Sequence, residues 1–152
     1  MTIEKLLVEG EGIEGVHTDS DGVAHTDHRR DIYVAFNGSL GGISTVGQIK
    51  ALVMREDCRL GGHFHTYQEA YLVVGSGDGI QAMFCLEDVN SGNKEVYELR
   101  SGDRIAFPGE VAHVVFAREG STLVGFDSEP YVPERSDHVH DMPWADAYNF
   151  QE

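Results

Sequence analysis

The segment from Gly62 to Tyr71 concentrates side chains that can bind a metal ion. Its sequence, GHFHTYQEAY, reads as part of one strand, in which side chains alternate between two faces. His63, His65 and Glu69 then share a face and can converge on one ion. Two imidazoles and a carboxylate suit a borderline divalent metal, at ligand distances of about 2.0–2.2 Å. The spacing therefore predicts a metal site with coordination positions left for water or a substrate.

A second segment, from Gly102 to His113, ends one strand in a proline turn and begins the next. Together the two segments resemble the two motifs of the cupin superfamily. The matching residues are His63, His65 and Glu69 in the first motif and Gly102, Pro108 and His113 in the second. In cupins the two histidines, the glutamate and the later histidine bind a metal inside a jelly-roll barrel. The resemblance covers roughly residues 48–127 and implies that His113 is the fourth ligand.

The departures from the cupin motifs fall between the ligand positions. Asp57 stands where the first motif begins with glycine, and Gly75 or Gly77 takes the place of its closing glycine one position off. In the second motif Glu110 replaces a glycine and Ala117 an asparagine. These changes affect the loops and leave the four ligands in place.

The elements that must position these ligands are short strands separated by turn residues, among them many of the 18 glycines. Strand patterns occupy residues 31–36, 48–55, 62–74, 80–86, 94–99, 104–107, 112–117 and 122–126. Such spacing is typical of an all-β sandwich or barrel. The resemblance makes the expected fold a cupin-type jelly-roll β-barrel, a double-stranded β-helix.

The 152 residues fit one domain, in which we expect three parts. Residues 1–47 supply N-terminal strands and turns to the barrel or to a dimer, 48–127 form the barrel, and 128–152 form an extended tail. The tail carries four aromatic residues, which are rarely left in water. They are Tyr131, Trp144, Tyr148 and Phe150. We expect them to pack across the barrel or a neighbouring subunit, and because cupins usually pair, we predict a homodimer.

Charge and composition exclude several classes of partner. Eleven Lys and Arg stand against 26 Asp and Glu, giving a formal charge of −15. This charge disfavours nucleic acid and anionic membrane surfaces. Cys58 and Cys85 have no paired spacing and are expected to be reduced thiols. Because no apolar leader follows Met1 and no apolar run reaches membrane-spanning length, we expect a cytoplasmic protein. We expect its partner to be a small molecule.

Two further residues are candidates for substrate binding. Tyr71 shares the parity of Glu69 and can line the cavity beside the metal. Arg55 shares the parity of Ile49 and Val53 and can face the pocket or the solvent. No catalytic residue is identified from the pattern alone.

Two groups of histidines lie outside the metal motif. The pair His138 and His140 lies in the proline-containing tail, where a solvated or partner-contacting role is expected. The group His17, His25 and His28 is expected on the polar surface, with pH-sensitive contacts as an alternative.

Three functions compete. Leu60–Gly77, Glu98–His113 and Glu129–Asp137 look similar to cupins of capsular and deoxysugar synthesis. That resemblance implies an isomerase or epimerase of a sugar or sugar nucleotide, in which a metal holds a sugar oxygen and Tyr71 moves a proton. The alternatives are a cupin dioxygenase using iron or manganese and a non-catalytic binding or sensing module. The expected cofactor is one divalent transition metal: zinc, iron, manganese or nickel.

Overall fold

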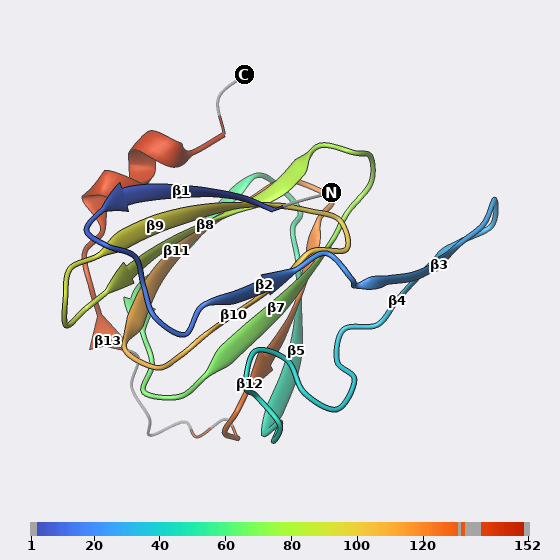
Figure 1. Cartoon of the computed structure of the whole chain (residues 1–152). Coiled ribbons are helices and arrows are strands. Elements are labelled where there is room, and N and C mark those ends of the chain that lie inside the picture. Colours follow the sequence, from blue (N-terminus) through green and yellow to red (C-terminus); the bar gives the residue numbers. More distant parts are fainter. Residues whose placement is uncertain (1–2, 131, 133–137, 151–152) are drawn as a thin grey trace.

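A computed structural model describes residues 3–130, 132 and 138–150, and most of its strands form two facing antiparallel sheets (Figure 1). The first sheet has the order β1 (Glu4–Glu9), β9 (Lys94–Arg100), β8 (Ile80–Asp88), β11 (Val111–Ala117), β6 (Cys58–Phe64) and β13 (His138–Val139). The second has the order β2 (His17–Asp19), β10 (Arg104–Phe107), β7 (Glu69–Val74), β12 (Thr122–Asp127) and β5 (Gln48–Val53). The described elements are strands apart from one short 3-10 helix, which confirms the all-β prediction.

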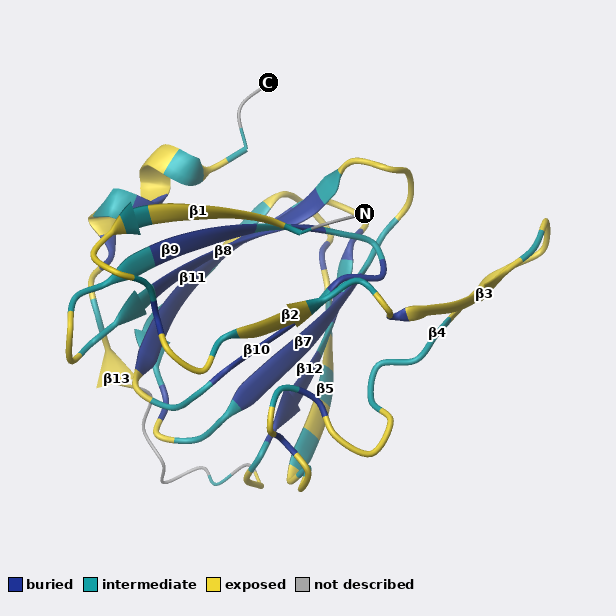
Figure 2. Cartoon of the chain, viewed as in Figure 1, coloured by how far each residue is buried: buried dark blue, intermediate teal, exposed yellow. Residues whose placement is uncertain are grey.

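The main core lies between the two sheets, where the inward-facing residues of both meet. Its fully buried members include Phe84, Leu86, Leu99, Ile105, Phe107 and Leu123. The strands in the middle of the sheets are the most deeply buried part of the molecule (Figure 2). Glu69 and His113 lie on two of these strands, β7 and β11, so a well-packed framework positions them.

The segment 62–74, predicted as one strand, is two strands in different sheets. β6 ends at Phe64, β7 begins at Glu69, and residues 65–68 turn the chain from one sheet to the other. This turn packs on the loop after β10: a Cβ at Gly109 would lie 2.5 Å from the carbonyl oxygen of Thr66. The Glu110 backbone N–H also donates to the carbonyl of His65 at 2.7 Å. Because both contacts join segments distant in sequence, no local pattern reveals the turn.

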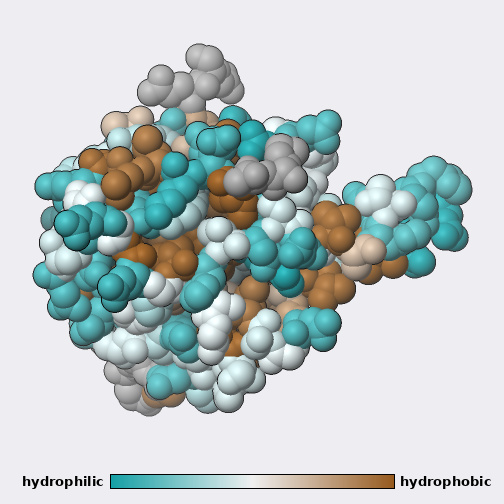
Figure 3. Space-filling model, in the orientation of Figure 1, coloured by the Kyte–Doolittle hydropathy of each residue, from teal (hydrophilic) through white to brown (hydrophobic). Residues whose placement is uncertain are grey.

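The N-terminal residues contain strands, as expected for residues 1–47, although the sequence pattern did not give the bounds of β1 and β2. β1 pairs with β9 and β2 pairs with β10, so each extends one of the sheets. The segment 31–36, predicted as a full strand, is ordered as a strand only over β4 (Asp31–Tyr33). It pairs with β3 (Val23–Thr26) in a ribbon that projects from the body and is mostly hydrophilic toward its tip (Figure 3).

The C-terminal segment, expected to be an extended tail, contains β13 and a 3-10 helix, η1 (Pro143–Tyr148). Trp144, Tyr148 and Phe150 pack with buried Met142 and Ala145 against the outer face of the first sheet. Tyr131 lies outside the described residues.

His138 stays exposed, in line with the solvated role expected for it, whereas His140 is half-buried. His138 stacks on Phe64 with ring centroids 4.8 Å apart, and His140 forms a hydrogen bond with the Glu87 carboxylate. Glu87 also accepts a hydrogen bond of 2.7 Å from Trp144 Nε1. The Glu87 side chain is 12% exposed, so it anchors the C-terminal segment from a nearly buried position.

No described helix is both long and apolar enough to cross a membrane. Cys58 and Cys85 are free thiols in the structure.

The contacts of Glu87 generate a stability prediction. Glu87→Ala leaves the half-buried Trp144 N–H and His140 ring without their hydrogen-bond partner. The free energy of unfolding should fall by about 1–3 kcal/mol. Urea unfolding should show that loss, and Glu119→Ala, which removes an exposed carboxylate, should leave the unfolding midpoint close to that of the wild type. Equal midpoints for Glu87→Ala and wild type would contradict the anchoring role.

Candidate metal site and the cavity beside it

Three histidines from the first sheet converge at one point. His63 lies in β6, His65 directly follows it, and His113 lies in β11. Their ligand nitrogens all lie within 4.8 Å of one another. His65 is 8% exposed and His113 4%, so two of the three imidazoles are buried.

Strand pairing brings His63 and His113 together. The two residues are directly opposite in the β6–β11 register, which breaks at the next position in a bulge. The bulge depends on Gly61, which has a φ of 94° and lies so close to β11 that a Cβ would sit 2.3 Å from the His113 carbonyl oxygen. Any other residue at position 61 would force the two ligand-bearing strands apart.

Glu69 reaches the histidines from the opposite sheet. Its Oε1 lies 3.8 Å from His65 Nε2 and its Oε2 lies 3.7 Å from His113 Nδ1. The structure thus brings the four predicted side chains together, but the shared-face argument for Glu69 is wrong. Convergence comes from the turn at 65–68, which places Glu69 at the start of β7, across the barrel from His63.

Burial controls the electrostatics of Glu69, which is 1% exposed. Loss of water raises the pKa of its carboxyl to about 7, although His65 and a hydrogen bond from Tyr71 act in the opposite direction. The Tyr71 hydroxyl donates to Glu69 Oε1 at 2.9 Å. Burial and the neighbouring Glu69 charge raise the pKa of Tyr71 well above its usual value, so its hydroxyl stays protonated at neutral pH.

Aromatic rings hold the histidines in place. Tyr67 stacks on His65 with centroids 4.7 Å apart and planes 14° apart, and Phe107 lies 5.3 Å from His113. Packing of this kind limits the rotamers of the imidazoles.

The site opens into a cavity of about 110 Å³. Its wall is formed by the three histidines with Lys50, Leu52, Leu60, Gly61, Tyr71, Val115 and Leu123. Tyr71 therefore lines the cavity as expected from its position. Arg55 does not: it is exposed in the bend after β5, on the same parity as Ile49 and Val53, which are 65% and 68% exposed.

Sequence reasoning missed Lys50, which lines the cavity, and Asp127, which is 1% exposed and lies 3.5 Å from the Lys50 ammonium. The sequence carries no signal for Lys50, because alternation would turn the apolar Ile49, Ala51 and Val53 inward, whereas in the structure these three are exposed and Lys50 faces the cavity. No local pattern distinguishes Asp127 from an ordinary strand-end carboxylate.

The donor set fits a divalent transition metal. Three imidazole nitrogens and a carboxylate are ligands that zinc, iron, manganese and nickel all accept. In residues 3–130, 132 and 138–150 these histidines are the one group of three or more possible ligands found so close together. His17, His25 and His28 are exposed, and His25 instead bonds to Asp27 at 2.9 Å.

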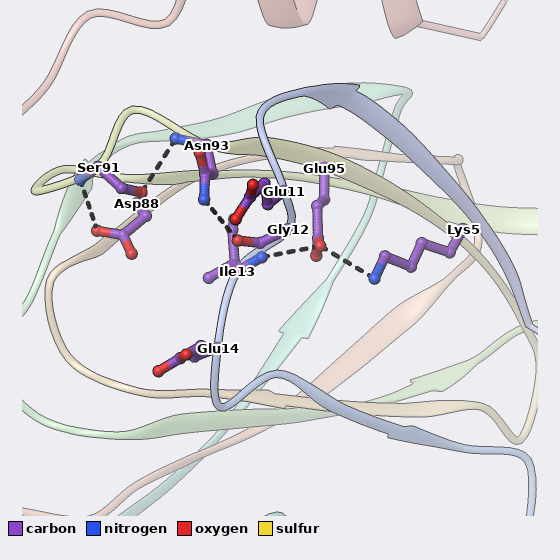
Figure 4. A pocket seen from close by; sticks show the side chains of 9 residues that line it. All are labelled: Lys5, Glu11, Gly12, Ile13, Glu14, Asp88, Ser91, Asn93 and Glu95. Carbon is purple, nitrogen blue, oxygen red and sulfur yellow. Dashed lines mark hydrogen bonds and ion pairs between the residues drawn. The ribbon is translucent and has the colours of Figure 1, made fainter.

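A larger open cavity of about 480 Å³ lies between the N-terminal strand and the β8–β9 turn (Figure 4). Its lining includes Glu11, Glu14, Asp88 and Glu95. Glu95 accepts hydrogen bonds from the Ile13 backbone N–H and the Tyr97 hydroxyl, and it pairs with Lys5 at 3.0 Å. These contacts attach the N-terminal segment to the barrel, which is a structural role.

Comparison with known proteins finds likeness in structure. No protein-family model matches the sequence, and no curated protein matches it. Among solved structures, ChmJ, a 3'-monoepimerase from Streptomyces bikiniensis in complex with dTDP-quinovose, has a TM-score of 0.69 and 19% identity, with 94% of this chain and 77% of that chain covered. dTDP-4-dehydrorhamnose 3,5-epimerase from Sulfolobus tokodaii has a TM-score of 0.68 and 20% identity, covering 94% and 87%. This chain has the jelly-roll fold of the cupin superfamily.

A third similar structure is QdtA, a sugar 3,4-ketoisomerase from Thermoanaerobacterium thermosaccharolyticum in complex with TDP. It has a TM-score of 0.64 and 13% identity, covering 88% of this chain and 93% of that chain. The likeness confirms, at the level of the fold, the resemblance to cupins seen in the sequence motifs. It spans most of the chain, so it includes strands outside residues 48–127, the range of the cupin motifs.

The converging side chains predict how metal content will respond to substitution. His113→Ala should lower the metal bound per chain, measured by elemental analysis after loading with zinc and desalting, because it removes a buried ligand. His25→Ala removes an exposed histidine and serves as the matched control. Unchanged metal content in His113→Ala, with both variants folded, would refute the site.

Proposed function

We propose that this cupin is a metal-dependent isomerase or epimerase that acts on the sugar of a sugar nucleotide. The observation that carries the proposal is the hydrogen-bonded pair of Tyr71 and Glu69, which lies beside three histidines at a cavity wall. The similar structures support it, since they are sugar-nucleotide epimerases and ketoisomerases by description.

Epimerisation and ketoisomerisation both relocate a proton next to a carbonyl group without any net oxidation. A divalent metal at the histidines would supply polarisation of a carbonyl or hydroxyl oxygen. The protein supplies a proton carrier: the Tyr71 hydroxyl is protonated, buried and fixed in direction by Glu69. A substrate atom in the cavity can give a proton to the Tyr71 oxygen while the Tyr71 proton passes to the Glu69 carboxylate, and the reverse transfer returns it.

The cavity size limits which part of a substrate can enter. A volume of about 110 Å³ corresponds to roughly four water molecules at about 30 Å³ each. Part of a sugar ring therefore reaches the histidines, and a nucleotide would remain outside the cavity.

A dioxygenase is the second candidate, because four of the side chains that line the cavity are apolar. They are Leu52, Leu60, Val115 and Leu123. Such a wall accepts an apolar substrate fragment beside iron or manganese. Substrate-dependent oxygen uptake by the iron-loaded protein would favour this alternative over an isomerase, which consumes no oxygen.

The proposal predicts proton exchange that depends on Tyr71. Metal-loaded protein incubated in D₂O with TDP-4-keto-6-deoxyglucose, the ligand of one QdtA structure, should place deuterium on a carbon next to the carbonyl. Tyr71→Phe should slow this exchange by about 100-fold or more while metal content stays unchanged. NMR of the recovered sugar measures both the rate and the position.

The matched control is Tyr33→Phe, since Tyr33 lies on the projecting ribbon and bonds to Ser101, away from the cavity. Equal exchange rates in Tyr71→Phe and wild type would contradict the role of Tyr71. Tight binding of sugar nucleotides without exchange or oxygen uptake would instead indicate a non-catalytic binding module. The predicted homodimer and cytoplasmic location stay predictions.

A further inference from the structure

We propose that Lys50 makes the cavity selective for a small anionic oxygen group, a carboxylate or an enolate, which it holds together with the metal. The inference rests on the proposed function only in assuming that a divalent metal occupies the histidine site. It names a chemical class of ligand and a specificity residue that the cupin motifs do not include.

The position of Lys50 is built by the second sheet. It lies in the middle of β5 on the inward parity and is paired in register with Gly125 of β12, which in turn is paired with Tyr71 of β7. A Cβ at Gly125 would lie 2.8 Å from Tyr71 Cε1 and 3.2 Å from Lys50 Cε. The Lys50 stem and the Tyr71 ring thus lie over the backbone of Gly125, and a larger residue there would displace them.

Asp127 fixes the charged end of Lys50. Its Oδ2 lies 3.5 Å from the Lys50 ammonium, and its side chain is 2% exposed, against 36% for Lys50. The ammonium therefore contacts a buried carboxylate, while the Lys50 side chain lines the cavity and stays 36% exposed. Asp127 is a positioning residue in this arrangement, because it acts through Lys50.

The charges around the cavity favour an anion once a metal is present. Glu69 and Asp127 contribute two negative charges, and Lys50 with a divalent ion contributes three positive ones when the histidines are neutral. A buried site with one excess positive charge is stabilised by a monoanion that pairs with it. Among the described side chains of the cavity wall, Lys50 is the one Lys or Arg. It therefore provides the excess in a protein whose formal net charge of −15 would otherwise repel anions.

The size and lining of the cavity restrict the anion to a small group. A space of about 110 Å³ holds a few heavy atoms, and Leu52, Leu60 and Leu123 give it an apolar wall. A carboxylate or an enolate on a two-carbon fragment satisfies both limits. A phosphate group fits this apolar wall less well, since its additional charged oxygens would lack donors there.

Glycolate bound to the cobalt-substituted protein tests the assignment without requiring turnover. Titration with glycolate should change the visible spectrum of bound cobalt and give a Kd. Lys50→Met should raise that Kd by about tenfold to a hundredfold, as expected for the loss of a charge-assisted hydrogen bond. Lys50→Arg keeps the charge and should retain most of the affinity. Lys5→Met, which removes a lysine that pairs with Glu95 outside this cavity, should match the wild type.

Cobalt content and far-UV circular dichroism establish that each variant is folded and loaded before titration. An unchanged glycolate Kd in Lys50→Met, or no spectral response of the wild type, would overturn the inference, and failure of the protein to bind cobalt would overturn it together with the metal site. If Lys50-dependent glycolate binding occurs while no sugar nucleotide exchanges deuterium, the inference holds and the proposed reaction fails.

Discussion

The site depends on one interaction, the contact across the barrel between the Glu69 carboxylate and the imidazoles of the opposite sheet. A carboxylate that is 1% exposed loses most of its hydration, and the two neutral imidazoles beside it do not replace water as a charged partner would. Its oxygens lie 3.8 and 3.7 Å from His65 and His113, too far for direct hydrogen bonds. A cation between them would compensate the carboxylate and shorten the contacts, so the framework is suited to an occupied site.

Local spacing in the sequence was sufficient to find His63, His65 and Glu69 as ligand candidates, and the cupin resemblance added His113, but neither explains how the four side chains meet. His63 and His65 follow from alternation along β6, whereas Glu69 belongs to another strand and another sheet. The turn between them contains no glycine or proline and is held by Gly109 and by the Glu110 N–H, more than forty residues further along the chain. The cupin motif includes Glu69, which the structure places beside His65 and His113, although the strand assignment that accompanied it was wrong.

The residues that sequence reasoning missed have ordinary local environments. Lys50 in a strand with alternating exposure reads as a surface lysine, because its inward direction depends on which face of β5 meets the barrel. Asp127 reads as the polar end of a strand. Only the register of β5, β12 and β7 places Lys50 and Asp127 in the rows that contain Tyr71 and Glu69. Such roles come from pairing between distant segments, which a single sequence does not specify.

The C-terminal segment completes the framework of the site, because its strand β13 covers the edge of β6 that would otherwise be unpaired. Without β13, β6 would be an edge strand, and edge strands have unpaired backbone groups and greater freedom to move. β13 pairs with Phe64 and His63, and the backbone N–H of His140 donates to the Gly62 carbonyl at 3.0 Å. Glu87 then holds this segment through His140 and Trp144. The strand that carries His63 is thus fixed on both sides, by β11 with His113 and by the C-terminal segment, so residues beyond the cupin motifs contribute to the geometry of the ligands.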